Sequence, residues 1–124
     1  MKKVISTTAA PAAIGPYSQA IVVNGFVFTS GQLPIDPATG EMPSDIAAQT
    51  EMSLKNVSAL LESAGTSLEK AVKMTVFVRD MNDFDTINAV YKHFLTGEAP
   101  ARSLIQAARL PKDAGIEIEC IAAL

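Results

Sequence analysis

The chain has few of the residues that carry metal and redox chemistry. Among its 124 residues there is one cysteine, Cys120, one histidine, His93, and no tryptophan. A single cysteine excludes an internal disulfide framework, and a single histidine leaves no obvious cluster for zinc or iron. We therefore expect no metal site. We interpret His93 as a solvated helix residue and Cys120 as a small hydrophobic residue in a strand.

Positive charge and long apolar runs are also scarce. Ten Lys and Arg residues stand against 13 Asp and Glu, which gives a formal net charge of −3. That balance argues against nucleic acid as the principal partner, because binding to its phosphate backbone needs a basic surface. The start of the chain has no apolar run of signal-peptide length, and no segment is long enough for a membrane helix. We expect a cytoplasmic protein with no membrane partner.

The residues that are present indicate one globular domain, residues 1–124. The length is sufficient to bury roughly two-thirds of the surface of the unfolded chain. Hydrophobic residues make up 48% of the sequence and charged residues 19%, so the chain is somewhat more apolar than an average soluble domain. An excess of this kind favours an oligomer, in which subunits hide apolar surface from water.

Turn and capping signals divide the chain into strands and two helices. Asn24-Gly25 joins the apolar runs 19–23 and 26–30, and this dipeptide is the strongest short-range signal for a hairpin. Residues 45–64 show helical spacing of apolar side chains, with Ser44 or Asp45 as the N-cap and Gly65 as the stop.

The second half of the chain predicts a strand, a helix and two more strands. A strand rich in β-branched residues covers 72–78, and a helix opens at Asn82 or Asp83. Two strands, 102–109 and 116–122, follow and are joined by a Pro-Lys-Asp-Ala-Gly turn. The order ββ(β)αβαββ indicates an α+β fold, a mixed sheet with two helices packed on one face.

The last strand indicates what covers the other face of the sheet. Side chains alternate, so Glu117, Glu119 and Ile121 share one face while Ile118 and Cys120 share the other. Both faces become apolar towards the end of the strand, which means that both are covered. One face can take the helices, and a neighbouring subunit is the simplest cover for the second.

The most informative stretch is Ala99-Pro100-Ala101-Arg102-Ser103. Proline is excluded from central strand positions, so Pro100 marks the entry of a strand and Arg102 lies near the mouth of the sheet. A guanidinium in that place can bind a small carboxylate through two parallel hydrogen bonds. The alternative is a surface arginine that pairs with a nearby acid.

Several ordered runs resemble the RidA/YjgF/UK114 family of reactive intermediate deaminases, and the resemblance covers essentially the whole chain. The runs that carry it are residues 10–19, 29–34, 76–81, 100–103, 109–113 and 117–119. The resemblance implies a chorismate-mutase-like subunit and a homotrimer with a barrel-like centre and clefts between neighbours. It also implies small 2-imino and 2-keto acid ligands. Water would convert 2-iminobutanoate or 2-iminopropanoate to the 2-ketoacid and ammonia, without a cofactor.

The resemblance also assigns roles to residues of this chain. Arg102 falls on the position that holds the substrate carboxylate, and Glu117 on the carboxylate that orients or activates the attacking water. The positions that line the cleft are Tyr17, Ser30, Gly31 and Asn88. These residue types suit the chemistry, because hydrolysis of a protonated imine needs a held substrate, a positioned water and modest proton transfer.

Each assignment has a plainer alternative. Glu117 could pair with Arg109 across a hairpin formed by the last two strands. Tyr17 could be a loop aromatic over a core edge, and Asn88 a helix-surface amide. Ser30-Gly31 could be an ordinary strand end, whereas the functional interpretation aims a backbone N–H and the hydroxyl at a ligand.

Two positions depart from the family pattern, and two other functions remain open. Leu104 stands where many members carry a cysteine, so thiol chemistry beside Arg102 is excluded. Ala99 stands where some members carry an aromatic residue, which leaves the preferred substrate side chain undetermined. The same cleft could serve a regulatory trimer that senses a small carboxylate. A ribonuclease acting on single-stranded RNA is disfavoured by the acidic balance and the missing histidine pair.

Overall fold

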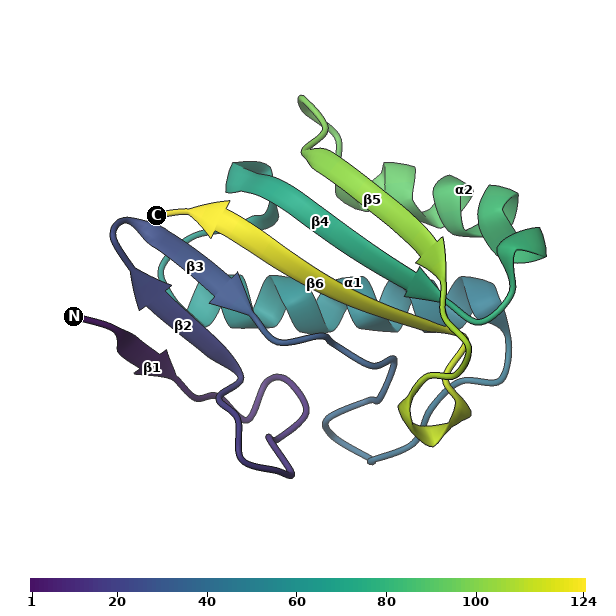
Figure 1. Cartoon of the computed structure of the whole chain (residues 1–124), viewed down its shortest axis with the longest axis horizontal. Coiled ribbons are helices and arrows are strands. Elements are labelled where there is room, and N and C mark those ends of the chain that lie inside the picture. Colours follow the sequence, from purple (N-terminus) through teal and green to yellow (C-terminus); the bar gives the residue numbers. More distant parts are fainter.

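In a computed structural model, which describes all of residues 1–124, one six-stranded sheet carries two helices on a single face (Figure 1). The strand order is β1-β2-β3-β6-β4-β5. The elements are β1 (Lys3–Ile5), β2 (Ala20–Val23), β3 (Phe26–Thr29), α1 (Ile46–Ser63), β4 (Ala71–Val78), α2 (Phe84–Phe94), β5 (Ala101–Gln106) and β6 (Ile116–Ala123). No helix combines the length and apolar character needed to cross a membrane.

Local signals placed most of these elements correctly. Asn24 and Gly25 both adopt positive φ, 50° and 79°, and join β2 to β3 as an antiparallel hairpin. The Asp45 side chain accepts a hydrogen bond of 2.9 Å from the Ala48 backbone N–H and so caps α1. Gly65, with φ of 89°, follows the last turn of that helix. The mixed sheet and the two helices on one face are confirmed.

The predicted hairpin between the last two strands is wrong. β5 lies at the edge of the sheet, parallel to β4, while β6 lies on the other side of β4 and pairs with it antiparallel. β5 also ends at Gln106, three residues before Arg109. The turn after β5 is real, but it leads the chain past the end of β4. A turn signal marks a reversal and does not specify which strand the chain returns beside.

The hydrophobic core lies between the helices and one face of the sheet. Alternate residues of β4 and β6 point into it and are buried, among them Met74, Val76, Ile116 and Ile118. From the helices, Leu54, Leu61 and Ile87 pack against them. This is the face predicted for the helices.

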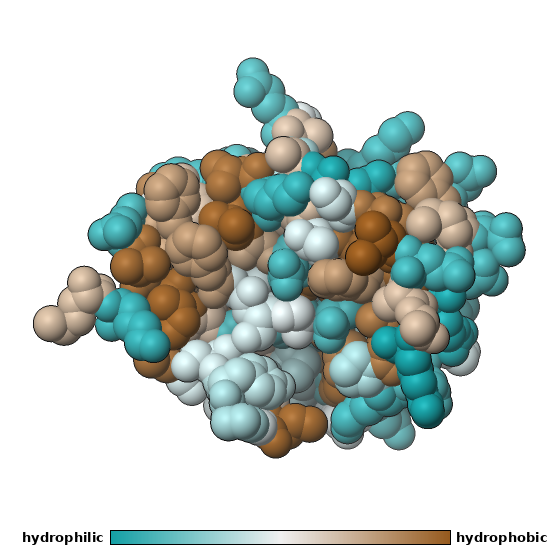
Figure 2. Space-filling model, in the orientation of Figure 1, coloured by the Kyte–Doolittle hydropathy of each residue, from teal (hydrophilic) through white to brown (hydrophobic).

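The opposite, open face of the sheet is also apolar. Phe26, Phe28 and Ile105 are exposed there, at 39%, 41% and 51%. Figure 2 shows this face towards the viewer, with apolar side chains gathered over β2 and β3 and again near β5. Exposed apolar side chains that gather in this way indicate an interaction site.

Candidate active site

Arg102 lies on the helix-covered face of edge strand β5, because its register partner on β4 is the buried Met74. Its Nη1 donates a hydrogen bond of 2.8 Å to the Asn88 side-chain oxygen on α2. The guanidinium carbon lies 4.8 Å from the centre of the Tyr91 ring and 5.8 Å from that of Phe84. No acidic side chain forms an ion pair with Arg102, so the alternative of a surface salt bridge is wrong.

Tyr91 is a neutral neighbour of this arginine. Burial raises the pKa of the Tyr91 hydroxyl to about 12, against a smaller lowering by Arg102. The buried hydroxyl has no hydrogen-bond partner. Phe84, Asn88 and Tyr91 therefore surround Arg102 with two rings and an amide. The sequence analysis did not identify this contact of the two aromatic rings with Arg102.

Glu117 lies on the open face of the sheet, half-buried beside Gly31. A Cβ built on Gly31 would lie 2.8 Å from the carboxyl carbon of Glu117, so a larger residue here would displace the carboxyl group from this position. Burial raises the pKa of Glu117, and the neighbouring Glu119 raises it further. A carboxylate with a raised pKa exchanges protons more readily near neutral pH, as a general acid–base group must.

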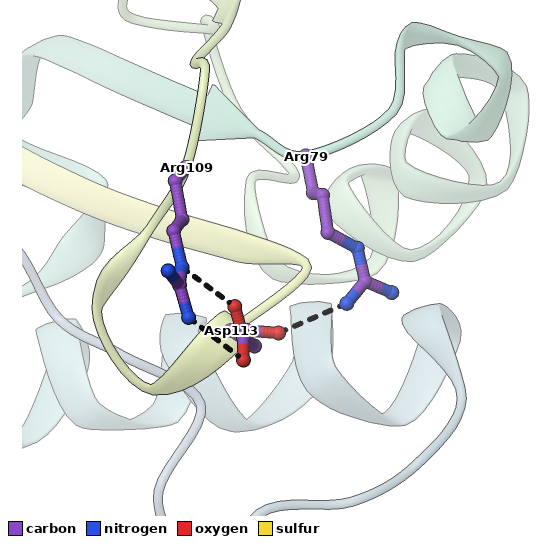
Figure 3. Close-up of polar contacts among 3 residues, drawn as sticks. All are labelled: Arg79, Arg109 and Asp113. Carbon is purple, nitrogen blue, oxygen red and sulfur yellow. Dashed lines mark hydrogen bonds and ion pairs between the residues drawn. The ribbon is translucent and has the colours of Figure 1, made fainter.

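Arg109 does not pair with Glu117. Its guanidinium forms two hydrogen bonds with the Asp113 carboxylate, of 2.9 and 3.3 Å, while Arg79 donates to the Asp113 backbone carbonyl at 3.0 Å (Figure 3). All three residues belong to the corner where β4 ends and the chain turns from β5 to β6. β4 lies between β5 and β6, so the chain after β5 is not paired with the strand that carries Glu117. Arg109 pairs within its own turn instead, and Glu117 forms no ion pair.

Ser30 and Gly31 differ in what they can offer a ligand. The Ser30 N–H donates to the Gln19 carbonyl at 2.9 Å, and its hydroxyl donates to the Ser18 carbonyl at 2.6 Å. Both donors of Ser30 are therefore occupied within the chain, and its hydroxyl oxygen can only accept from a ligand. The Gly31 N–H makes no hydrogen bond within the chain. It remains a free donor beside the Glu117 carboxylate.

Tyr17 lies in the loop before β2 and is half exposed. It lines a hollow of about 220 Å³ together with Gly31, Gln32 and Lys112. A larger hollow, of about 830 Å³, lies beneath the N-terminal segment and also includes Tyr17, but it contains no charged side chain. Of the two, the smaller hollow is the better candidate for a ligand-binding site, because Gly31 lines it and the Glu117 side chain lies beside Gly31. No group of three or more His, Cys, Asp or Glu side chains is arranged to hold a metal ion.

One subunit does not bring the two principal candidates together. Arg102 is in register with Met74 and Glu117 with Phe77, so their side chains leave opposite faces of the sheet. They lie two strands and three residues apart, a Cα separation of about 14 Å from standard strand spacing. A small ligand in contact with the Arg102 guanidinium is therefore out of reach of Glu117 of the same chain.

Comparison with known proteins identifies the family of this chain. The model of the family described as Endoribonuclease L-PSP matches residues 7–124. The chain belongs to this family. Among curated members, the 2-iminobutanoate/2-iminopropanoate deaminase of Escherichia coli is 54% identical over 98% of each chain. The resemblance to the RidA/YjgF/UK114 proteins is thereby confirmed.

Solved structures of the family have the same fold. The crystal structure of E. coli TdcF with bound serine is 51% identical, covers 98% of each chain and superposes with a TM-score of 0.95. The crystal structure of the E. coli YjgF gene product is 52% identical over 98% of each chain, also with a TM-score of 0.95. The α+β architecture is therefore that of the family.

Proposed function

We propose that this protein is a cofactor-free hydrolytic deaminase of reactive 2-imino acids and their enamine tautomers, such as 2-iminobutanoate and 2-iminopropanoate. The observation that carries the proposal is the 54% identity, over nearly the full length of both chains, to a protein of that name. The chemistry of the candidate residues supports it, since an arginine without an acidic partner and a half-buried carboxylate with a raised pKa are both present.

The reaction needs little beyond binding and proton transfer. Arg102 holds the substrate carboxylate, and the Glu117 carboxylate takes a proton from water as the water oxygen bonds to the imine carbon. Glu117 then returns that proton to the nitrogen of the carbinolamine formed from the protonated imine. As the C–N bond breaks, Glu117 takes the proton of the new hydroxyl, so that the 2-ketoacid and ammonia form, and the ammonia leaves as ammonium with that proton. A positioned acid–base group of this kind contributes about 10²- to 10⁴-fold to the rate.

We propose a homotrimer of single-domain subunits, residues 1–124, as the active form. The apolar open face of the sheet supports this, because its exposed aromatic and aliphatic side chains favour cover by a second copy. A cleft between subunits would let Arg102 of one copy approach Glu117, Gly31 and Tyr17 of the next. The serine bound to TdcF is a small amino acid with a carboxylate, the kind of ligand that such a cleft suits. We place the reaction in the cytoplasm, where unpaired cysteines such as Cys120 are the rule.

A coupled assay tests the proposal. Threonine dehydratase generates the imine, and 2-ketobutanoate release and semicarbazide trapping of the imine are followed with and without this protein. Wild type should speed ketoacid release and reduce trapping, and Arg102→Ala should lose about 10²-fold or more of the effect. Lys55→Ala is the control, because Lys55 is an exposed α1 residue whose only described partner is Glu51.

The same assay separates the alternatives. If wild type has no effect on ketoacid release but binds 2-ketobutanoate through Arg102, the protein is a sensor of small carboxylates and the enzyme proposal is wrong. If wild type cleaves single-stranded RNA, and Arg102→Ala and Lys55→Ala cleave it equally well, that activity does not use the site proposed here. The net charge of −3 does not favour that result.

A further inference from the structure

One face of α2 is built around the guanidinium of Arg102. Phe84, Asn88 and Tyr91 follow each other at intervals of four and three residues, so they form one stripe along the helix. All three contact the same side chain on the neighbouring strand β5. The stripe therefore forms a cradle for Arg102, and of its three residues Tyr91 also belongs to the core.

The hydrogen bond from Arg102 leaves its carboxylate-binding edge free. Asn88 accepts from Nη1, the guanidinium nitrogen that lies away from the edge formed by Nε and Nη2. That edge carries two parallel N–H groups that match the two oxygens of a carboxylate. No other hydrogen bond or ion pair of the chain uses Arg102. The amide fixes the orientation of the guanidinium without occupying the binding edge.

The aromatic rings hold the plane of the same group. Tyr91 is 8% exposed, and its ring centre lies 4.8 Å from the guanidinium carbon, within the range of a cation–π contact. Its hydroxyl has no partner, so the ring, and not the hydroxyl, makes the interaction. Phe84 adds a second ring at 5.8 Å.

We propose that Phe84, Asn88 and Tyr91 are positioning residues for the substrate carboxylate, acting by holding the Arg102 guanidinium with its Nε–Nη2 edge free. Asn88, which the sequence placed in the cleft as a ligand-binding residue, acts through Arg102 in this proposal. The role in binding rests on the proposed function. The contact between Tyr91 and Arg102 does not, and the two are tested separately.

The contact is tested by a double-mutant cycle on unfolding, with Tyr91→Leu and Arg102→Met made singly and together at one fixed protomer concentration. The cradle predicts coupling of about two- to fivefold in the unfolding equilibrium constant, the size of a cation–π contact. The same cycle with Phe94→Leu should be additive, because Phe94 packs against the core from the same helix. Additive effects of Tyr91→Leu and Arg102→Met would overturn the proposal, whether or not the protein is an enzyme.

The role in binding is tested by titrating each variant with 2-ketobutanoate. Tyr91→Leu should weaken binding about 5- to 30-fold, and Asn88→Ala about 10-fold, while Phe94→Leu should bind as wild type does. Tyr91→Phe keeps the ring and should recover most of the affinity lost in Tyr91→Leu. Equal affinity of Tyr91→Leu and wild type, or loss in Tyr91→Phe as large as in Tyr91→Leu, would overturn the role assigned to the ring. If wild type does not bind 2-ketobutanoate at all, the proposed function fails, and the unfolding cycle still decides the contact.

Discussion

At the scale of single residues, the role proposed for Glu117 in catalysis opposes its effect on the stability of the fold. Burial and Glu119 raise its pKa above the ordinary glutamate value. Folding therefore favours the protonated form. Its favourable effect on stability is complete below the pKa of the unfolded chain and is lost as the pH rises through the higher pKa of the folded state. At neutral pH the carboxylate is a cost to the fold.

Glu117→Gln should accordingly raise stability and lower activity at pH 7. The amide removes the buried charge, so the variant should resist urea better than wild type, and the difference should vanish at about pH 3, below the glutamate range. The loss of proton transfer should reduce kcat about 10²- to 10⁴-fold. Urea titrations at both pH values and the coupled assay measure the two effects. A variant less stable than wild type at pH 7 would contradict the assigned cause of the raised pKa.

Gly31 is the residue that makes room for this carboxylate. Gly31→Ala would place a Cβ 2.8 Å from the Glu117 carboxyl carbon, so the carboxylate must move. Because Gly31 does not adopt positive φ, alanine fits the backbone, and stability should change by about 1 kcal/mol or less. Activity should fall about 10-fold or more, since small displacements of a catalytic group are costly. Gly97→Ala, at a position with nothing within 4 Å, is the control and should leave the rate unchanged.

At the scale of elements, the sequence predicted what depends on near neighbours. The α1 cap at Asp45 and the Asn24-Gly25 hairpin follow from residues within four positions of one another, and both are confirmed. The strand–helix–strand order of β4, α2 and β5 favours a parallel pair, but no local pattern tells that β6 lies on the other side of β4. The expected bond between Arg109 and Glu117 failed for this reason. The sequence also did not predict the contact of Asn88 with Arg102. That contact joins α2 to β5, and it depends on how the helix packs beside the strand.

The turn from Pro111 to Asp113 contains strain that its ion pair does not account for. Lys112 and Asp113 adopt φ of 57° and 53°, a region that favours glycine. The Arg109–Asp113 pair is exposed on both sides, and such pairs contribute about 1 kcal/mol or less. We expect the backbone strain to be the larger effect.

Substitutions at Lys112 measure this strain. Lys112→Gly should stabilise the protein or leave it unchanged, within about 1 kcal/mol, because glycine adopts positive φ freely but loses more entropy on folding. Lys112→Val should destabilise by about 1–2 kcal/mol, since a β-branched residue is poorly tolerated there. Arg109→Ala removes the ion pair without changing a residue of positive φ, and thermal unfolding ranks all three variants. Equal stability of the glycine and valine variants would show that the turn is not strained.

At the scale of the whole molecule, the apolar side chains exposed on the open face of the sheet support the proposed assembly. The sequence predicted this from β6, where residues on both faces become apolar towards the end of the strand. It did not predict that Arg102 and Glu117 would leave opposite faces, because their relative placement depends on the strand order. The same arrangement makes the assembly a requirement of the proposed chemistry.

Mixing two inactive variants tests that requirement. Arg102→Ala and Glu117→Gln, each purified alone, should be nearly inactive. When they are unfolded, mixed in equal amounts and refolded, a site that takes Arg102 from one subunit and Glu117 from another has a one-half chance of each intact residue. About one quarter of the wild-type activity should therefore return, because every cleft of a closed ring joins two subunits. Refolding each variant separately before mixing is the control and should restore none. If the co-refolded mixture forms trimers by light scattering but stays inactive while refolded wild type is active, Arg102 and Glu117 serve the same site from one subunit, and the assembly proposed here is wrong.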